Sequence, residues 1–215
     1  MTTAKTPVVD RVARLRTLAE VDRQTAQDAA WTWLRRLGTG LPGHDAEAQL
    51  AQLFAAGSPA DVDGQTEGML VGWTTPDADL DTAGRVIHTV ARTTTTRLGL
   101  MPWLGKYFDQ QARRGTNTVT RTAVVLTRLI APTYRFRRAS DHWQGFDMLT
   151  HVEPSVISPE VDVLVLDYET IGTNPWPINH IRDEAVEIVP GVLLGAKLWH
   201  QNNGYRQLAY WAAKS

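Results

Sequence analysis

Residues 161–199, VDVLVLDYETIGTNPWPINHIRDEAVEIVPGVLLGAKLW, decide the fold of this chain. The stretch is rich in Val, Leu and Ile and is interrupted between Gly172 and Pro177. Apolar runs bounded by Gly and Pro are typical of strands in a sheet. We therefore expect a β-rich core with a polar cluster at one rim. The interruptions carry the densest group of side chains that could bind a ligand or transfer a proton: Asn174, Trp176, His180, Arg182, Asp183 and Glu184.

The residues on either side of this stretch extend the same pattern. Asn203-Gly204 favours a hairpin turn. Tyr134 and Phe136 alternate with arginines, as in a strand with one face exposed to solvent. Closely spaced strands without helices between them favour an antiparallel meander, and closure into a barrel removes exposed edges. Strands are predicted over 64–75, 103–108, 117–129, 133–138, 144–151, 161–169, 176–182, 185–188, 192–199 and 205–212.

Helices are predicted mainly before the barrel. Apolar residues recur on three- and four-residue steps over 8–37, and a shorter helix is expected over 45–56. The stretch 77–100 suggests one more helix, although Thr93–Thr96 is a poor helical run because its side chains are β-branched. We expect a mainly β, α+β protein: a lipocalin-like barrel over 61–215, with a helical insertion over 77–100, capped by helices over 1–60. The N-terminal helices either cover the sheet or form a homodimer contact.

Composition excludes several classes of protein. The chain has 215 residues, no cysteine and a formal net charge of −1. A disulfide framework and a thiolate nucleophile are therefore excluded, and a broad electrostatic footprint for nucleic acid is not expected. The N-terminus lacks the apolar core of a signal peptide, and no apolar run is long enough to span a membrane. We expect a cytoplasmic protein with no nucleic-acid partner and no membrane span.

Three short motifs together resemble the GXWXG-type family of small lipocalin-like proteins. Leu53-Phe54 followed by Gly64-Gln-Thr-Glu-Gly68 is similar to the opening segment of that family, with Thr66 in the place of the central Trp. Trp103-Leu-Gly-Lys-Tyr-Phe108 is similar to its W-x-G-K-x-F segment. The closing strands are similar from Asp167-Tyr168 through Pro177-Ile178, His180, Arg182 and Asp183 to Gly195 and Lys197. The resemblance implies a calycin-like barrel with an internal small-molecule site.

Other local motifs have structural explanations. Gly38 to Gly43 matches GxGxxG, but it follows a helix and contains Pro42, so we interpret it as a helix-ending loop. Ser140-Asp141-His142 cannot form a triad because neighbours in sequence cannot act as nucleophile, base and orienter. There is no paired-His spacing and no cofactor fingerprint, so no metal and no cofactor are expected.

The candidate catalytic groups are His180, Asp167 and Glu184. Alternation puts His180 and Arg182 on one face if 176–182 is a strand, and puts Asp167 and Glu169 on the face of Val163 and Val165. A carboxylate on a barrel-lining face would have a raised pKa suited to proton transfer. The competing interpretation is an ion pair of Arg182 or His180 with a carboxylate that fixes strand register.

The sequence leaves three functions open. The first is a binding protein for a hydrophobic or aromatic small molecule, because tryptophan suits pockets and barrel mouths. The second is a cofactor-independent isomerase, cyclase or lyase in which His180 and a carboxylate move a proton. The third is an interaction protein that pairs through its N-terminal helices. The candidate ligand-binding residues are Trp73, Trp103, Lys106, Asn117, Tyr134, Trp143, Trp176 and Arg182.

Overall fold

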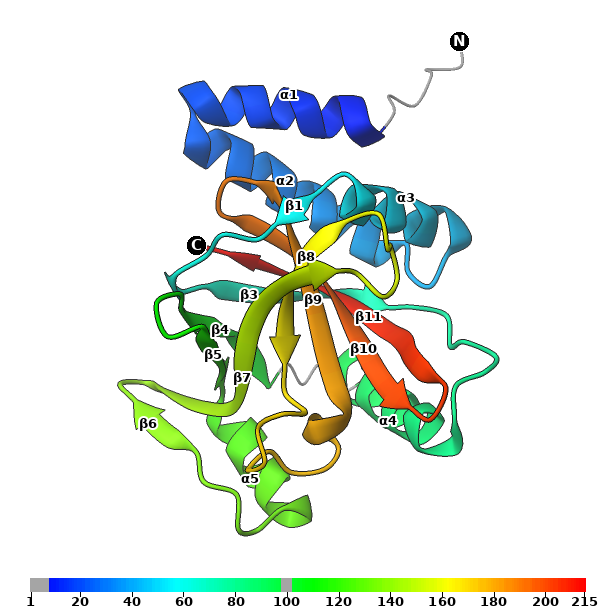
Figure 1. Cartoon of the computed structure of the whole chain (residues 1–215), viewed down its shortest axis with the longest axis vertical. Helices are drawn as coiled ribbons and strands as arrows, with labels where there is room; N and C mark the ends of the chain where they lie inside the picture. The colour runs from blue at the N-terminus through cyan, green and yellow to red at the C-terminus, as the bar shows by residue number, and fades with distance from the viewer. Residues whose placement is uncertain (1–7, 98–101) are drawn as a thin grey trace.

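The computed structural model describes residues 8–97 and 102–215. Its strands are β1 (Ser58–Pro59), β2 (Gly64–Gln65), β3 (Glu67–Trp73), β4 (Trp103–Asp109), β5 (Arg114–Val119), β6 (Arg137–Ala139), β7 (His142–Pro154), β8 (Asp162–Asp167), β9 (Ile181–Val189), β10 (Val192–Gln201) and β11 (Gly204–Lys214). They form one antiparallel sheet in the order β2-β4-β5-β7-β8-β9-β10-β11-β3, with β1 on β9 and β6 on β7. The sheet curls into a nearly closed barrel (Figure 1). The predicted fold class, mainly β with N-terminal helices, is confirmed.

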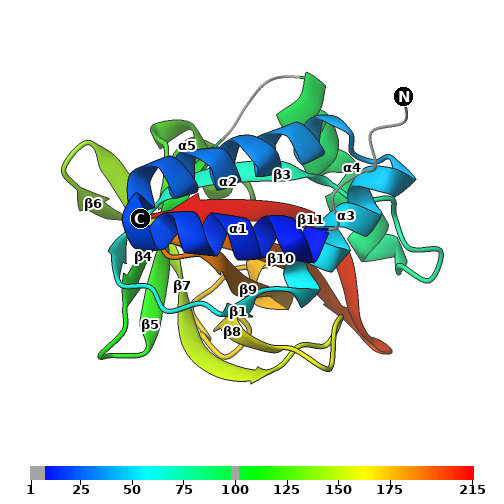
Figure 2. The ribbon, with the colours of Figure 1, turned by 90° about the horizontal axis from the view of Figure 1, so that it is seen from above.

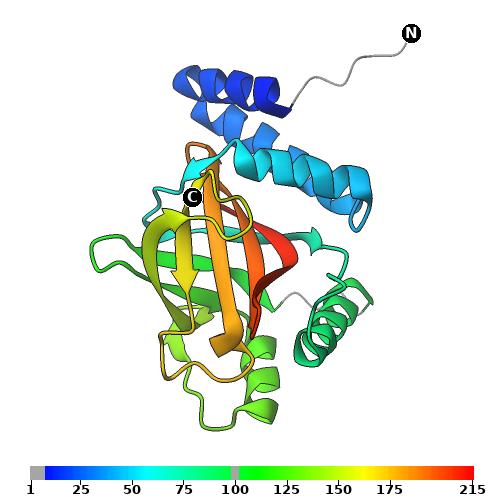
Figure 3. The ribbon, with the colours of Figure 1, turned by 45° about the vertical axis from the view of Figure 1, so that its right-hand side comes forward.

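The helices are α1 (Val8–Val21), α2 (Arg23–Thr39), α3 (His44–Ala55), α4 (Thr82–Arg97) and α5 (Arg121–Ile130), with the 3-10 turn η1 (Ile178–His180). The stretch predicted as one helix over 8–37 is two, because Asp22 ends α1 and caps α2 through a hydrogen bond from the Thr25 amide. α1–α3 gather at one end of the barrel, whereas α5 lies at the other (Figures 1 and 3). Of the helices described, none is long and apolar enough to cross a membrane.

Both faces of the central strands are buried, in two separate cores. The outward face of β8–β11, with Val163, Val165, Val186 and Leu194, packs with apolar side chains of α1–α3. Seen from above, these helices lie across that part of the sheet (Figure 2). The inward face packs as a second core that fills much of the barrel with its own side chains, among them Phe108, Met148, Leu166, Tyr168 and Trp211. Alternation along each strand therefore separates a helix-packing face from a barrel-lining face.

The barrel closes along a seam between β3 and β4. Thr66, between β2 and β3, donates its backbone N–H to the Lys106 carbonyl at 2.8 Å, and its hydroxyl accepts the Lys106 N–H at 3.2 Å. Gly105 crosses this seam at φ +151°, where a Cβ atom would lie 2.0 Å from the Thr66 carbonyl oxygen. A side chain at that position is excluded by sterics as well as by backbone conformation. Beyond it β3 turns to pair with β11, from Glu67 opposite Lys214 to Trp73 opposite Ala209.

Three predicted strands were wrong in extent. The strand over 117–129 ends at Val119, because Thr120 caps α5 and Ala123, Val124 and Thr127 form a buried helical face. Only Arg137–Ala139 of 133–138 is a strand, since Tyr134 and Phe136 instead pack against the ring of Phe146. The strand over 176–182 is replaced by a loop and η1, and β9 begins at Ile181. The helix suggested over 77–100 is present as α4, and the end of that range lies outside the described residues.

Candidate functional site

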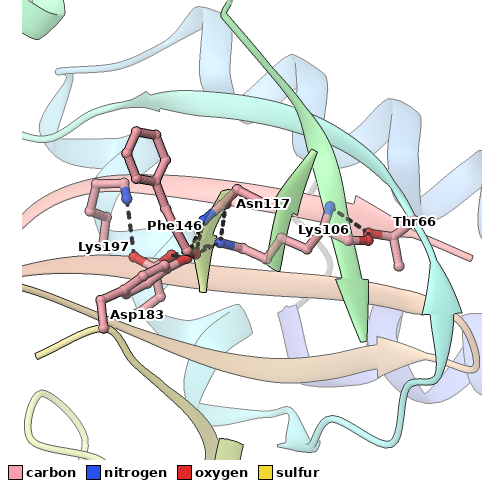
Figure 4. Close-up of polar contacts among 7 residues, drawn as sticks. Thr66, Lys106, Asn117, Phe146, Asp183 and Lys197 are labelled. Atoms are coloured by element: carbon pink, nitrogen blue, oxygen red, sulfur yellow. Dashed lines mark hydrogen bonds and ion pairs between the residues drawn. The ribbon is translucent and has the colours of Figure 1, made fainter. Parts of the chain in front are cut away.

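Lys106 is a lysine buried inside the barrel. Its side chain is 2% exposed and runs inward from β4 (Figure 4). The Nζ atom donates to Asn117 Oδ1 at 3.1 Å, to the Tyr168 hydroxyl at 2.6 Å and to Asp183 Oδ2 at 2.9 Å. Each of its three N–H bonds therefore has an acceptor, as a buried ammonium group requires. We call Lys106, Asn117, Tyr168, Asp183 and Lys197 the Lys106 cluster.

Asp183 is the centre of charge in the Lys106 cluster. It stands opposite Lys197 in the register of β9 and β10, and its Oδ1 atom lies 3.2 Å from Lys197 Nζ. Asp183 is fully buried, whereas the Lys197 side chain is 31% exposed and connects the cluster toward solvent. With both lysines protonated, two ammonium groups surround one carboxylate and the cluster carries a net positive charge.

Burial governs the protonation of this cluster. It lowers the pKa of Lys106 to about 8, against the opposing attraction of Asp183. Burial alone would raise the pKa of Asp183, but the charges of Lys106 and Lys197 hold it below its ordinary value. Burial and the Asp183 charge raise the pKa of Tyr168, which stays a neutral phenol. The cluster therefore combines an ionised carboxylate, a neutral hydroxyl and an amine whose pKa is lowered to about 8.

Two tryptophans form the apolar wall beside Lys106. Lys106 Nζ lies 4.7 Å from the ring centroid of Trp211 and 5.4 Å from that of Trp103, within the range of cation–π attraction. The two indoles meet edge to face with centroids 5.9 Å apart. Both indole Nε1 atoms are buried without a hydrogen-bond partner among the described residues. Buried N–H groups are normally paired, so this wall holds two unused donors.

A groove with a volume of about 710 Å³ runs along the outside of the seam. It lies between α2, the loop after α2, the length of β3, the end of α4 and the start of β4. Trp103 lines this groove and also contacts the Lys106 side chain, so a single indole separates the groove from the Lys106 cluster. We call this groove the seam groove. Its lining consists of Trp31, Arg35, Gly38, Leu41, Pro42, Glu67–Trp73, Arg92, Thr95, Thr96, Trp103 and Leu104.

A second charged group lies on the outward face of β9. Arg182 Nε donates to Glu184 Oε1 at 2.9 Å, and Arg182 Nη2 lies 2.6 Å from Glu153 Oε1. Glu184 also accepts the Ser155 hydroxyl at 2.5 Å and the Val156 amide at 3.1 Å. This arrangement, the Arg182 cluster, ties β9 to β7 and to the loop after it. It has the form of the ion pair that the sequence offered as an alternative to catalysis.

The structure does not bring the candidate catalytic residues together. His180 lies in η1 with its ring stacked on Trp199 at 5.2 Å. Asp167 accepts the amides of Glu169 and Thr170, which caps the turn after β8. The face that Asp167 would share with Val163 packs on the helices instead of lining the barrel, so the expected barrel-lining carboxylate is supplied by Asp183. Glu184 belongs to the Arg182 cluster.

The candidate ligand-binding residues divide among several places. Trp73 and Trp103 line the seam groove, and Lys106 and Asn117 lie in the Lys106 cluster. Tyr134 stacks on Phe146, and Trp143 packs against the core under α5. Trp176 is half exposed in the loop before η1, and Arg182 belongs to the Arg182 cluster with Glu153 and Glu184. Sequence reasoning missed the groove residues Trp31, Arg35 and Arg92. The first two come from a helix that it assigned to the N-terminal cap, and Arg92 comes from the predicted helical insertion.

Among the described residues, no three His, Asp or Glu side chains gather as metal ligands do. No protein-family model matches the chain, and no curated protein matches it at a significant level. One solved structure is similar, a crystal structure of a protein from Thermomonospora curvata. The two chains share 15% identity with a TM-score of 0.38, and the match covers 78% of this chain and 85% of that one.

Proposed function

We propose that this protein binds a small molecule with an apolar or aromatic body and an anionic group in the seam groove. The observation that carries the proposal is the groove itself. Its volume of about 710 Å³ falls within the range of ligand sites, roughly 300–1,000 Å³. Its lining joins three tryptophans to two arginines, which is the mixture of apolar wall and few polar anchors that such sites use.

The apolar part of the lining is held in place by its own contacts. Trp73 donates its indole N–H to the Thr95 hydroxyl at 2.7 Å, and Thr95 in turn donates to the Ala91 carbonyl at 2.9 Å. The rings of Trp73 and His88 also meet edge to face, with their centroids 5.4 Å apart. These contacts fix the wall between β3 and α4 before any ligand arrives. A pre-formed wall supports affinity because less side-chain freedom is lost on binding.

The anionic group is assigned to the two arginines. Arg35 comes from α2 and Arg92 from α4, so they enter the groove from different elements. Within residues 8–97 and 102–215, neither guanidinium has a carboxylate at ion-pair distance, whereas Arg137 has one and Arg182 and Arg206 have two each. Arg is suited to bidentate recognition of carboxylate, sulfonate or phosphate groups. Glu67, at the far end of β3, would disfavour an anion there and so gives the ligand a direction.

Two of the motifs that resemble the GXWXG-type family meet beside the seam groove. Gly68 of the opening motif and Trp103 of the second motif meet at the seam, where a Cβ atom on Gly68 would lie 2.7 Å from Trp103 Cη2. The first two of the three segments that carry the resemblance therefore contribute to one wall of the groove, through Glu67, Gly68, Trp103 and Leu104. The resemblance implies an internal site, and we place the ligand at the seam with Trp103 between it and the interior.

Anilinonaphthalenesulfonate tests the proposal, because it combines an aromatic body with an anion. We expect saturable, one-to-one binding that quenches tryptophan fluorescence. Replacing Arg35 and Arg92 together by Ala should weaken it about tenfold, since two partly exposed charge contacts contribute about 0.7 kcal/mol each. The matched control is Arg36→Ala with Arg85→Ala, two exposed arginines on the same helices that do not line the groove. If both double variants weaken binding equally, or if neither weakens it, Arg35 and Arg92 do not hold the anionic group.

Native mass spectrometry of the freshly purified protein provides an independent test. A co-purified molecule should carry an acidic group, and Trp103→Ala should release it because this indole forms one side of the groove. Trp143→Ala removes an indole that packs away from the groove and serves as the control. Retention of the molecule by Trp103→Ala and its loss from Trp143→Ala would place the ligand elsewhere.

A further inference from the structure

α5 presents an exposed apolar face at the end of the barrel opposite the N-terminal helices (Figures 1 and 3). Val125, Leu126, Leu129 and Ile130 are 53%, 40%, 76% and 65% exposed. Residues four apart share a face of a helix, so these side chains form one continuous stripe. The opposite face, with Ala123, Val124 and Thr127, is buried against the barrel. Four adjacent aliphatic side chains in water mark an interaction surface.

Basic residues lie on α5 beside the stripe and in the segment that follows it in sequence. The segment 121–141 contains five arginines and a single acidic residue, Asp141, which gives it a net charge of +4 in a chain whose total is −1. Arg137 is paired with Asp147 at 2.6 Å. The other four arginines are exposed. We call Val125, Leu126, Leu129 and Ile130, together with Arg121, Arg128, Arg135 and Arg138, the distal patch.

We propose that the distal patch docks on the surface of an anionic phospholipid bilayer. A short amphipathic helix with aliphatic residues on one face and arginines along it is suited to lie in the headgroup region without spanning the membrane. The aliphatic side chains enter the acyl boundary while the arginines reach the phosphates. The loop before η1 reaches the same end of the barrel, and it carries the half-exposed Trp176, a residue type that favours the membrane interface.

Charge argues against a second copy of the chain on this surface. A two-fold dimer would bring the same patch of each subunit together, which places two segments of net charge +4 against one another. Like charges across an interface are unfavourable, whereas an anionic bilayer complements them. Nucleic acid would also supply negative charge, but its phosphate backbone offers no apolar layer to cover Leu129 and Ile130.

The test is flotation with phosphatidylcholine vesicles prepared with and without phosphatidylglycerol at equal total lipid. The protein should float only with the anionic vesicles and should be released as salt is raised. Two double variants should each lower the bound fraction roughly tenfold. Leu129→Gln with Ile130→Gln removes part of the apolar insertion, and Arg128→Gln with Arg135→Gln removes part of the attraction to lipid phosphates. These side chains are exposed, and thermal unfolding checks that both variants remain folded.

The matched control is Val86→Gln with Val90→Gln, two similarly exposed valines on α4 away from the distal patch. It should bind the vesicles as the unaltered chain does. The proposal is overturned if anionic vesicles do not recruit the protein at low salt, if both vesicle types recruit it equally, or if the α5 variants bind unchanged. A dimer in solution that Leu129→Gln with Ile130→Gln dissociates would overturn it in favour of a second copy.

Discussion

Asp183 and Glu184 are neighbours on β9 and both are fully buried, but they lie on opposite faces of the sheet. Asp183 points into the barrel and is held by two lysines from β4 and β10. Glu184 points outward and is held by Arg182, a serine hydroxyl and a backbone amide. One carboxylate therefore counters two cations, whereas the other belongs to a group in which Glu153 and Glu184 share one arginine.

The difference shows how a barrel can place the same chemistry in two kinds of surroundings. The Arg182 cluster opens to solvent through Glu153, whose side chain is 40% exposed, and the loop after β7 supplies its remaining donors. The Lys106 cluster is enclosed by tryptophan and tyrosine rings and reaches solvent through Lys197. Removing one partner from an enclosed ion pair strands an uncompensated charge, while a pair near solvent can recruit water.

The largest expected effect comes from Asp183→Asn. This change leaves the side-chain volume almost unaltered but deprives the buried Lys106 of its counter-charge. We expect the free energy of unfolding at neutral pH to fall by about 3–5 kcal/mol, as measured by urea denaturation. A loss below about 1 kcal/mol would mean that Asn117 and Tyr168 alone satisfy the ammonium group, and the inward cluster would then be no more sensitive than the outward one.

Sequence alone predicted the architecture because alternation and turn residues are local signals. β8, β10 and β11 lie close to their predicted ranges, and so does α3. The errors fall where local and tertiary signals conflict. Residues 121–130 contain β-branched residues that suit a strand, yet the Thr120 cap and a buried face at helical spacing determine the outcome.

The candidate site was predictable only in part. Which side chains near the start of β9 share a face depends on the residue at which that strand begins. Starting that strand at Trp176 coupled His180 to Arg182, whereas its true start at Ile181 leaves His180 in a turn. Lys106, Tyr168, Asp183 and Lys197 were all present in the motifs that resemble the GXWXG-type family. The seam groove had no such signal, because it joins helix residues to a strand edge that only the assembled barrel brings together.

A smaller loss is expected from Glu184→Gln. The glutamine keeps one oxygen that can accept a hydrogen bond, and Arg182 keeps its contact with Glu153 at 2.6 Å. We expect the free energy of unfolding to fall by about 1–3 kcal/mol in the same urea experiment, the range for one buried hydrogen-bonding group left poorly paired. Combining it with Glu153→Gln should cost more than the two single changes added together, because Arg182 then has no carboxylate. Additive losses would show that the two glutamates do not share the arginine.

The smallest effect expected is a pH dependence that belongs to the inward cluster alone. The pKa of Lys106 is lowered by burial from 10.5 to about 8 in the folded protein. Between these two values the unfolded chain binds more protons than the folded one, so stability should rise with pH, by about 1 kcal/mol from pH 8 to pH 9. Above pH 10 the trend should reverse, because burial raises the pKa of Tyr168 and of three other tyrosines, Tyr134, Tyr205 and Tyr210, and the folded state then retains protons that the unfolded state loses. Lys106→Met, which keeps the apolar stem, should abolish the rise, while Glu184→Gln should keep it. A rise that persists in Lys106→Met would assign the titration to another group and remove the main electrostatic difference between the two faces of β9.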